Sequence, residues 1–254
     1  MSSDNKFHSE TIDLPSGGKF YPENSPLHSG QLDLFFMCTK HEDILSSSNL
    51  IAKGTVLDKL FEALIATPGV KPTDLLVGDL NAVMIASRIL GYGKDYEVTA
   101  SCPVCDTTQK VTVDLTQLVN KEPLTTVTLI GTTFKVELPV SKAVVTFKLL
   151  TRGDEKKMQS EIEGYKKIDK DVQPETSIFF KFIITSINDQ TESSMIAQFV
   201  NSMLVRDSRF LRETYKQCMP DIKLEFNYTC TGCDKNSEVK LPISVNFFWP
   251  DAGV

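Results

Sequence analysis

The stretch YEVTASCPVCDTTQKVTV, residues Tyr96 to Val113, carries the pattern from which we predict the fold. Its β-prone ends and polar middle predict two short strands joined by a turn, and the turn contains Cys102 and Cys105. Two residues between two cysteines let both thiolates of one tight turn face a single metal ion. The stretch therefore predicts one half of a metal site.

A second stretch near the C-terminus has the same design. KLEFNYTCTGCDKNSEVKLPI, residues Lys223 to Ile243, again sets a C-x-x-C pair between β-prone segments, with an Asp directly after the second cysteine. The two pairs are 124 residues apart, but the entropy cost of closing a loop grows only logarithmically with its length. We expect one structural zinc ion in a split, zinc-ribbon-like β element, held by Cys102, Cys105, Cys230 and Cys233.

Three alternatives to a zinc site compete for these cysteines. A thioredoxin-like redox pair would stand before a helix, two disulfides would need an oxidising compartment, and four unrelated thiols would not form two matched turns. Pro103 and Gly232 suit metal-binding turns, Pro by fixing φ and Gly by allowing a positive φ. Four thiolates leave no open coordination position, so the expected zinc is structural. Cys38 and Cys218 have no partner in the pattern and are expected to be buried as small apolar residues.

Composition limits the class of protein. The chain has 254 residues and a net charge of −6, which argues against a broad nucleic-acid surface because phosphate neutralisation needs clustered Lys and Arg. No apolar run approaches the roughly 18 residues of a membrane helix. The N-terminus MSSDNKFHSE is polar and has no signal-peptide core. We therefore expect a cytoplasmic protein with reduced thiols and no membrane partner.

The N-terminal segment reads as an extended arm. Residues Glu10 to Gly30 are rich in Pro, Gly and Ser, yet they are too apolar for a free linker. We expect the arm to contact a partner subunit, and packing on its own domain is the alternative. The aromatic tail VNFFWPDAGV, Val245 to Val254, leaves the same two possibilities open. The arm residues expected to bind the partner are Ile12, Leu14, Phe20 and Tyr21.

The remaining pattern predicts an α+β protein with a helical domain and a helical insertion. We expect a strand at 31–39, helices at 41–66 with a break at 46–49, a helix at 77–93 capped by Asp79 and ended by Gly91 and Gly93, a hairpin at 125–139 turning at Gly131, a strand at 143–151, and helices at 152–167, 177–188, 193–204 and 206–218. The expected regions are an extended arm (1–30), an N-terminal strand and helical region (31–95), the first zinc knuckle with a β-hairpin (96–150), a helical insertion (151–220), and the second knuckle with a C-terminal strand and tail (221–254).

The sequence offers no catalytic constellation. Its three histidines, His8, His28 and His41, lie in the first fifth of the chain, and His41 is expected to start a helix. The segment from Ser16 to Lys19 departs from the phosphate-loop pattern at two positions. We therefore expect a protein that is not an enzyme and has no small-molecule substrate.

Several segments together resemble one family. LPSGGKFYP, then HEDIL and NLIAKG, then GDLNAVMIASRILGYGKDYEV leading into CPVC, resemble the baseplate proteins of T4-like contractile-tailed bacteriophages, which are hub or hub-assembly components. The resemblance implies a non-enzymatic protein made in the cytoplasm of the infected bacterium. It also implies other baseplate or hub proteins as partners, either as a subunit of the virion tail or as an assembly factor.

Two rival classes remain open at this stage. A zinc-ribbon nucleic-acid-binding or regulatory protein would need basic and aromatic residues around the knuckles, but the lysines there are few and lie beside acidic residues such as Asp234 and Glu238. A peptidase or lysozyme-like hub component would need a carboxylate pair or an open metal site. Salt-dependent DNA binding would favour the first rival, and wall-degrading activity the second.

Overall fold

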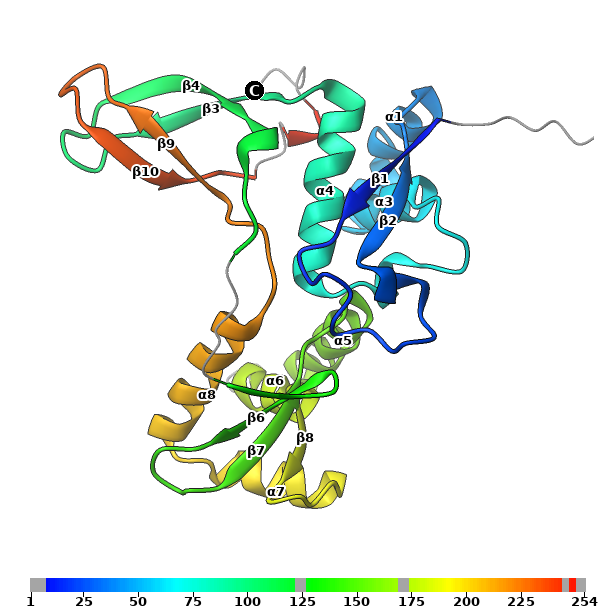
Figure 1. Cartoon of the computed structure of the whole chain (residues 1–254), viewed down its shortest axis with the longest axis vertical. Coiled ribbons are helices and arrows are strands. Elements are labelled where there is room, and N and C mark those ends of the chain that lie inside the picture. Colours follow the sequence, from blue (N-terminus) through cyan, green and yellow to red (C-terminus); the bar gives the residue numbers. More distant parts are fainter. Residues whose placement is uncertain (1–7, 122–126, 169–173, 244–246, 250–254) are drawn as a thin grey trace, which may run out of the picture.

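The molecule has three parts, which Figure 1 shows side by side. The structure is a computed structural model and describes residues 8–121, 127–168, 174–243 and 247–249. We call the parts the N-terminal lobe (residues 8–93), the cysteine lobe (95–118 and 224–241) and the insert lobe (127–168 and 174–220). In sequence, the insert lobe interrupts the cysteine lobe, because it lies between the two cysteine turns.

The N-terminal lobe combines a two-stranded sheet with helices. Strand β1 pairs antiparallel with β2, and the expected break after the first helix is present, with a further break at Gly54, whose φ is 65°. The first half of the strand expected at 31–39 is confirmed as β2. The elements are β1 (Ser9–Asp13), η1 (Pro26–Ser29), β2 (Gln31–Phe35), α1 (Thr39–Leu45), α2 (Ser48–Ala52), α3 (Val56–Leu64), η2 (Pro72–Asp74) and α4 (Val77–Tyr92).

Helix α4 ends at Gly93 as expected, but Gly91, which was also predicted to end it, lies inside the helix, and the helix begins differently. Gly93 terminates it with a φ of 85°, a left-handed value that Gly adopts without strain. Asp79 does not cap the helix, because Leu76 holds the N-cap position. The Asp79 carboxylate is instead buried and accepts hydrogen bonds from the Ser16 amide and the Tyr21 hydroxyl. Asp79 therefore binds the N-terminal arm, whereas the sequence pattern predicted it as the cap of α4.

The insert lobe holds a four-stranded antiparallel sheet in the order β5-β6-β7-β8, with helices beside it (Figure 1). The predicted hairpin turn at Gly131 is confirmed, with a φ of 58°. Residues 125–126 of the predicted hairpin lie outside the described residues. The elements are β5 (Thr128–Ile130), β6 (Thr133–Glu137), β7 (Val144–Lys148), α5 (Arg152–Ile168), α6 (Glu175–Ile183), β8 (Ile184–Ile187), α7 (Ser193–Ser202) and α8 (Val205–Cys218).

The helix predicted at 177–188 is wrong in its second half. Helix α6 ends at Ile183, and the next four residues form β8 against β7. The apolar run concealed this change, because buried strands and buried helices show the same lack of polar residues. The β-branched residues Ile184, Thr185 and Ile187 fit a pleated sheet, and β8 pairs with β7 across a register shift at Thr146 and Phe147. The region boundary predicted at 150 therefore divides one sheet.

The chain enters and leaves the insert lobe through two segments that lie side by side, which we call the neck (residues 119–121 and 221–223). The Lys121 amide donates to the Asp221 carbonyl and the Lys223 amide to the Val119 carbonyl, both at 2.8 Å. Helix α4 packs closely on the chain just after α8 here, since a Cβ at Gly78 would overlap the Pro220 carbonyl oxygen. The neck is thus a short antiparallel ribbon held against α4.

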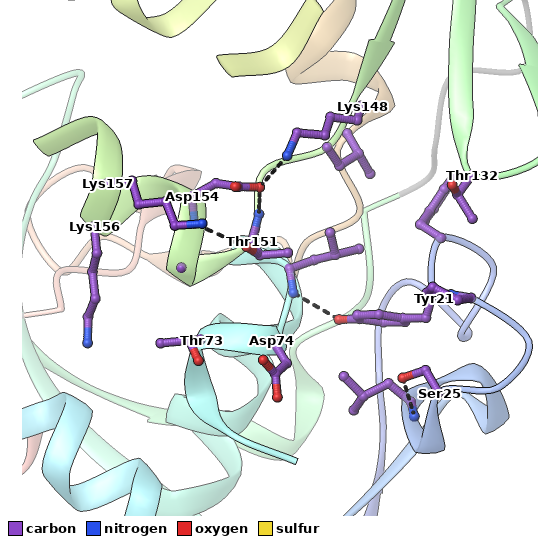
Figure 2. Close-up of a pocket in the computed structure, with 16 residues that line it drawn as sticks. Tyr21, Ser25, Thr73, Asp74, Thr132, Lys148, Thr151, Asp154, Lys156 and Lys157 are labelled. Atoms are coloured by element: carbon purple, nitrogen blue, oxygen red, sulfur yellow. Dashed lines mark hydrogen bonds and ion pairs between the residues drawn. The ribbon is translucent and has the colours of Figure 1, made fainter. Parts of the chain in front are cut away.

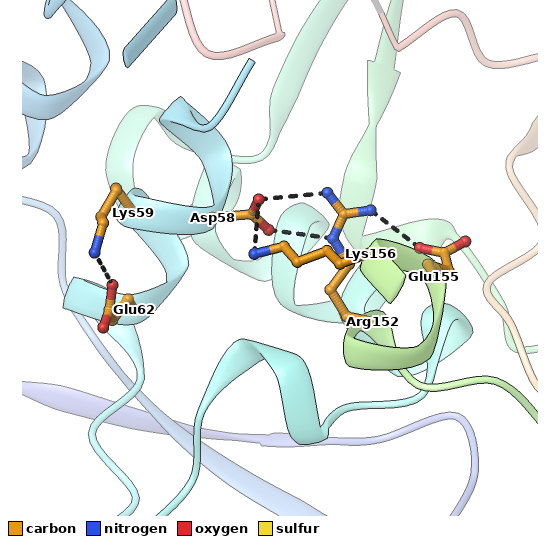
Figure 3. Close-up of polar contacts among 6 residues, drawn as sticks. All are labelled: Asp58, Lys59, Glu62, Arg152, Glu155 and Lys156. Atoms are coloured by element: carbon orange, nitrogen blue, oxygen red, sulfur yellow. Dashed lines mark hydrogen bonds and ion pairs between the residues drawn. The ribbon is translucent and has the colours of Figure 1, made fainter. Parts of the chain in front are cut away.

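A second junction joins the N-terminal lobe directly to the start of α5. The Arg152 amide donates to the Leu75 carbonyl at 2.8 Å. Asp58 on α3 pairs with both Arg152 and Lys156 at 3.1 Å, as Figure 3 shows. Burial raises the pKa of Asp58, but the hydrogen bonds from Arg152 and Lys156 outweigh this and hold the pKa below its ordinary value. The insert lobe is therefore fixed to the N-terminal lobe as well as to the cysteine lobe.

Candidate metal centre

Two matched hairpins build the cysteine lobe, and each carries one cysteine turn. They are β3 (Asp95–Ser101) with β4 (Thr108–Asp114), and β9 (Glu225–Thr229) with β10 (Asn236–Lys240). In both turns the amide of the first cysteine donates to the carbonyl five residues later, at 2.9 and 3.0 Å, and its carbonyl accepts from the amide four residues later, at 2.9 Å. The predicted likeness of the two stretches is thus confirmed at the level of the backbone.

The backbone conformation explains why an Asp follows each cysteine pair. Asp106 and Asp234 have φ values of 57° and 55°, in the left-handed region that Asp tolerates better than most residues. The role predicted for Gly232 was wrong, because Gly232 is not among the residues with positive φ. Its small size matters instead, since a Cβ there would lie 2.5 Å from Thr107 Oγ1 of the other turn.

The four cysteine sulfurs converge at the tips of the two hairpins. The Sγ atoms of Cys102 and Cys233 are 3.8 Å apart, and those of Cys105 and Cys230 are 3.6 Å apart. All four sulfurs lie within 4.8 Å of one another. Four sulfurs at about 2.3 Å from one zinc ion would form a tetrahedron with edges of about 3.8 Å. The predicted gathering of these cysteines is confirmed, and its geometry is compatible with one metal ion.

Backbone amides point at two of the sulfurs, and the Cys105 sulfur lies 3.3 Å from Thr107 Oγ1. The amides of Val104 and Gly232 lie 3.4 and 3.3 Å from the sulfurs of Cys102 and Cys230. The Val104 amide lowers the pKa of Cys102, and the Thr107 hydroxyl lowers the pKa of Cys105 to about 6. A lower pKa favours the thiolate, the form that binds metal, at these two cysteines. At Cys233 the hydrogen bond from the Lys235 backbone lowers the pKa, but burial and the sulfurs of the other cysteines outweigh it and raise the pKa to about 12. All six cysteines of the chain are free thiols.

Gln109 links the two hairpins independently of any metal, and the sequence pattern did not single it out. Its side-chain amide donates to the Thr229 carbonyl at 3.1 Å, and its oxygen accepts from the Thr231 amide at 2.7 Å. Gln109 stands on β4, whereas its partners Thr229 and Thr231 are the two neighbours of Cys230 in the other hairpin. Because a polar residue on a strand is ordinarily solvent-facing, the sequence carried no signal for this contact.

The N-terminal arm lies on its own chain, which is the alternative that the sequence left open. Leu14 and Tyr21 are buried and therefore leave little surface for the partner contact expected of them. Tyr21 donates to Asp79 at 2.6 Å and accepts from the Leu76 amide at 2.8 Å. Figure 2 shows Tyr21 in the lining of a cavity of about 800 Å³. Ile12 packs against the core, and the Phe20 ring lies tilted against Phe134, with the ring centroids 5.3 Å apart.

The aromatic end of the chain also packs inward. Phe247 and Phe248 are buried, and the Trp249 indole donates to the Leu45 carbonyl at 3.1 Å. Phe247 meets the Tyr96 ring edge to face, at the base of the cysteine lobe. Residues 250–254 of the predicted tail, and residues 244–246 before these aromatics, lie outside the described residues.

The remaining singled-out residues have structural roles. His41 lies in the first turn of α1, as expected, and its Nδ1 accepts from the Cys38 amide at 2.9 Å. Burial lowers the pKa of His41 and raises the pKa of Cys218 to about 11. Cys218 is buried as predicted, whereas Cys38 is only half-buried.

Comparison with known proteins identifies the family. A family model described as T4 bacteriophage base plate protein matches residues 9–249. The chain belongs to this base plate family. The resemblance seen in the first half is therefore confirmed, and the match continues through the insert lobe to the second cysteine turn. Neither a curated protein nor a solved structure matches the chain.

Membership of the base plate family indicates a structural role and other phage baseplate proteins as partners. It also implies the virion tail as a location. Within the described ranges, no helix combines the length and apolar character needed to cross a membrane.

Proposed function

We propose that this chain is a structural or assembly component of the baseplate of a T4-like, contractile-tailed phage, folded around one structural zinc ion. The family match over residues 9–249 supports the baseplate role. The convergence of four thiols supports zinc, because an all-sulfur tetrahedral site favours soft, tetrahedral ions and leaves no open position for a substrate. Zinc would then contribute to folding rather than to chemistry.

Metal content tests the zinc directly. Elemental analysis of protein purified without chelator should give one zinc per chain, and a Cys102, Cys105, Cys230 and Cys233 to Ser variant should give none and melt at a lower temperature. A Cys38→Ser/Cys218→Ser variant is the matched control and should keep the metal. Absence of metal from the unsubstituted protein would refute the site and reopen the redox and disulfide alternatives.

Complementation tests the baseplate role. In bacteria infected by a phage that lacks this gene, the plasmid-borne chain should restore complete baseplates. Mass spectrometry of gradient-purified tails then separates the two forms of the proposal, since a subunit stays in the tails and an assembly factor does not. Normal baseplates in the absence of the chain would refute both forms.

We retain the arm as a proposed partner contact only through Ile12 and Phe20, which are half-buried and keep some surface for a neighbour. Ile12→Asp should weaken co-purification with other baseplate proteins, whereas Leu129→Asp, which places the same charge at an exposed apolar residue of β5, should not. Equal co-purification of the two variants would remove the arm from the interface.

A further inference from the structure

Three helices of the insert lobe, α5, α6 and α8, contribute the residues that line a groove. Its volume is about 460 Å³, within the range of pockets that bind a ligand or a few side chains. Apolar side chains form its floor and basic residues of α8 stand at its rim. The floor consists of Met158, Ile162, Phe179 and Tyr215, and the basic rim residues are Arg212 and Lys216.

The floor is apolar, and contacts with neighbouring residues hold its aromatic side chains in place. Phe179 meets Tyr215 edge to face at 5.1 Å, and the Tyr215 hydroxyl accepts from the Leu150 amide at 3.2 Å. Met158 and Phe179 are only half-buried, so part of their apolar surface faces the groove. Met adapts its shape to different partners more readily than branched residues do. The groove therefore offers an apolar surface of the kind that receives anchor side chains.

The α8 wall is positively charged. Arg209, Arg212 and Lys216 are spaced by three and four residues, which places them on one stripe of the helix. Within the described part of the chain none of the three has a carboxylate partner, and Arg212 only approaches Thr176 Oγ1 at 3.4 Å. Glu175 on the opposite rim is paired with Lys166 at 3.6 Å. A chain with a net charge of −6 thus carries a local cationic stripe beside an apolar groove.

We propose that this groove binds an acidic amphipathic segment of another baseplate protein. The inference rests on the proposed function and names the chemistry of one partner. Apolar side chains of the segment enter the floor, and its carboxylates meet Arg209, Arg212 and Lys216. A nucleic acid fits less well, because its charged phosphates would not be stabilised by the apolar floor. The rings of Phe179 and Tyr215 also pack edge to face on each other and are therefore not free to stack on bases.

Charge reversal provides the first test. Arg209 and Lys216 are exposed, so Arg209→Glu/Lys216→Glu should keep the zinc content and melting temperature of the unsubstituted chain. In the complementation assay it should lower the phage titre at least about tenfold, as the loss of two interfacial charges predicts. Lys53→Glu/Lys71→Glu, which changes the same charge at exposed sites of the N-terminal lobe, is the control and should keep the titre.

A crosslink identifies what occupies the groove. Benzoylphenylalanine in place of Gln159, which lines the groove, should crosslink during infection to a baseplate protein at a segment with apolar residues beside Asp or Glu. The charge-reversed variant should lose this crosslink, and benzoylphenylalanine in place of the exposed Asn201 on α7 should not give it. Crosslinks to a second copy or to nucleic acid, or no crosslink during assembly, would overturn the proposal.

The two proposals fail in different ways. If the unsubstituted chain does not restore baseplates, the proposed function is wrong. If it restores them and the charge-reversed variant restores them equally well, the function stands and only the groove is wrong.

Discussion

Gly232 lies where the two cysteine turns touch, and the room it leaves is filled by Thr107 of the other turn. We predict that Gly232→Ala destabilises the zinc-loaded protein by about 1–3 kcal/mol, the usual cost of forcing an extra methyl into a packed site. Thermal unfolding and competition with a zinc chelator would measure the change. Adding Thr107→Ala should restore much of the loss by removing the overlapping atoms. A Gly232→Ala protein as stable as the parent would show that the turns can separate freely.

Asp58 allows a prediction about pH. Its pKa is lowered in the folded protein, so its ionised form stabilises the fold at pH values above the unfolded pKa of about 3.9. This contribution is lost as the pH falls through the lower folded pKa. Asp58→Asn should cost about 1–2 kcal/mol at pH 7, since it weakens a pair with Arg152 and Lys156 that is partly shielded from solvent.

The pH dependence is measured as the difference in the free energy of unfolding between the parent protein and Asp58→Asn. Urea unfolding of the parent and of Asp58→Asn should give a difference in the free energy of unfolding that is constant from pH 7 to about 4 and becomes smaller below pH 4. Because the loss of metal in acid affects both proteins, it cancels in the comparison. A gap that widens in acid would contradict the assigned direction of the pKa shift.

At the scale of elements, the contact between α4 and the chain just after α8 depends on Gly78. We predict that Gly78→Ala destabilises the protein by about 1–3 kcal/mol, because the new methyl overlaps a backbone carbonyl that cannot move without shifting the neck. Thermal unfolding checks the magnitude, and proteolysis near residues 119–121 checks the location. Gly164→Ala on α5, where a Cβ meets nothing, is the control and should be neutral or slightly stabilising.

The elements also show what the sequence could and could not predict. The cysteine turns were predictable because the short spacing within each pair places its two sulfurs on one turn. Strand β8 was not, since Ile184 to Ile187 continue an apolar run and only pairing with β7 distinguishes strand from helix. The link through Gln109 and the shift of Asp79 from cap to arm contact depend on tertiary neighbours, which local patterns do not encode. The same holds for the inward packing of Tyr21.

At the scale of the whole molecule, removal of the metal should act unequally on the three lobes. We predict that a chelator increases hydrogen exchange in β3, β4, β9 and β10, which hold the cysteine turns, and leaves β7 and α8 near their original protection. The reason is that the insert lobe keeps its four-stranded sheet and its junction with Asp58, neither of which involves the cysteine turns. A uniform rise in exchange would show that the three lobes unfold as one unit.

The geometry of the neck affects how the insert lobe can vary between related genes. Because residues 119–121 run antiparallel to residues 221–223, the two ends of the insert lobe leave the rest of the chain as neighbours. A two-residue turn such as Asn-Gly joins paired antiparallel strands, so the coding sequence between them can change without moving any of the four cysteines, provided that α5 keeps its contacts with Leu75 and Asp58. Phages that trade gene segments could thus alter the surface presented by the insert lobe while inheriting the cysteine turns unchanged.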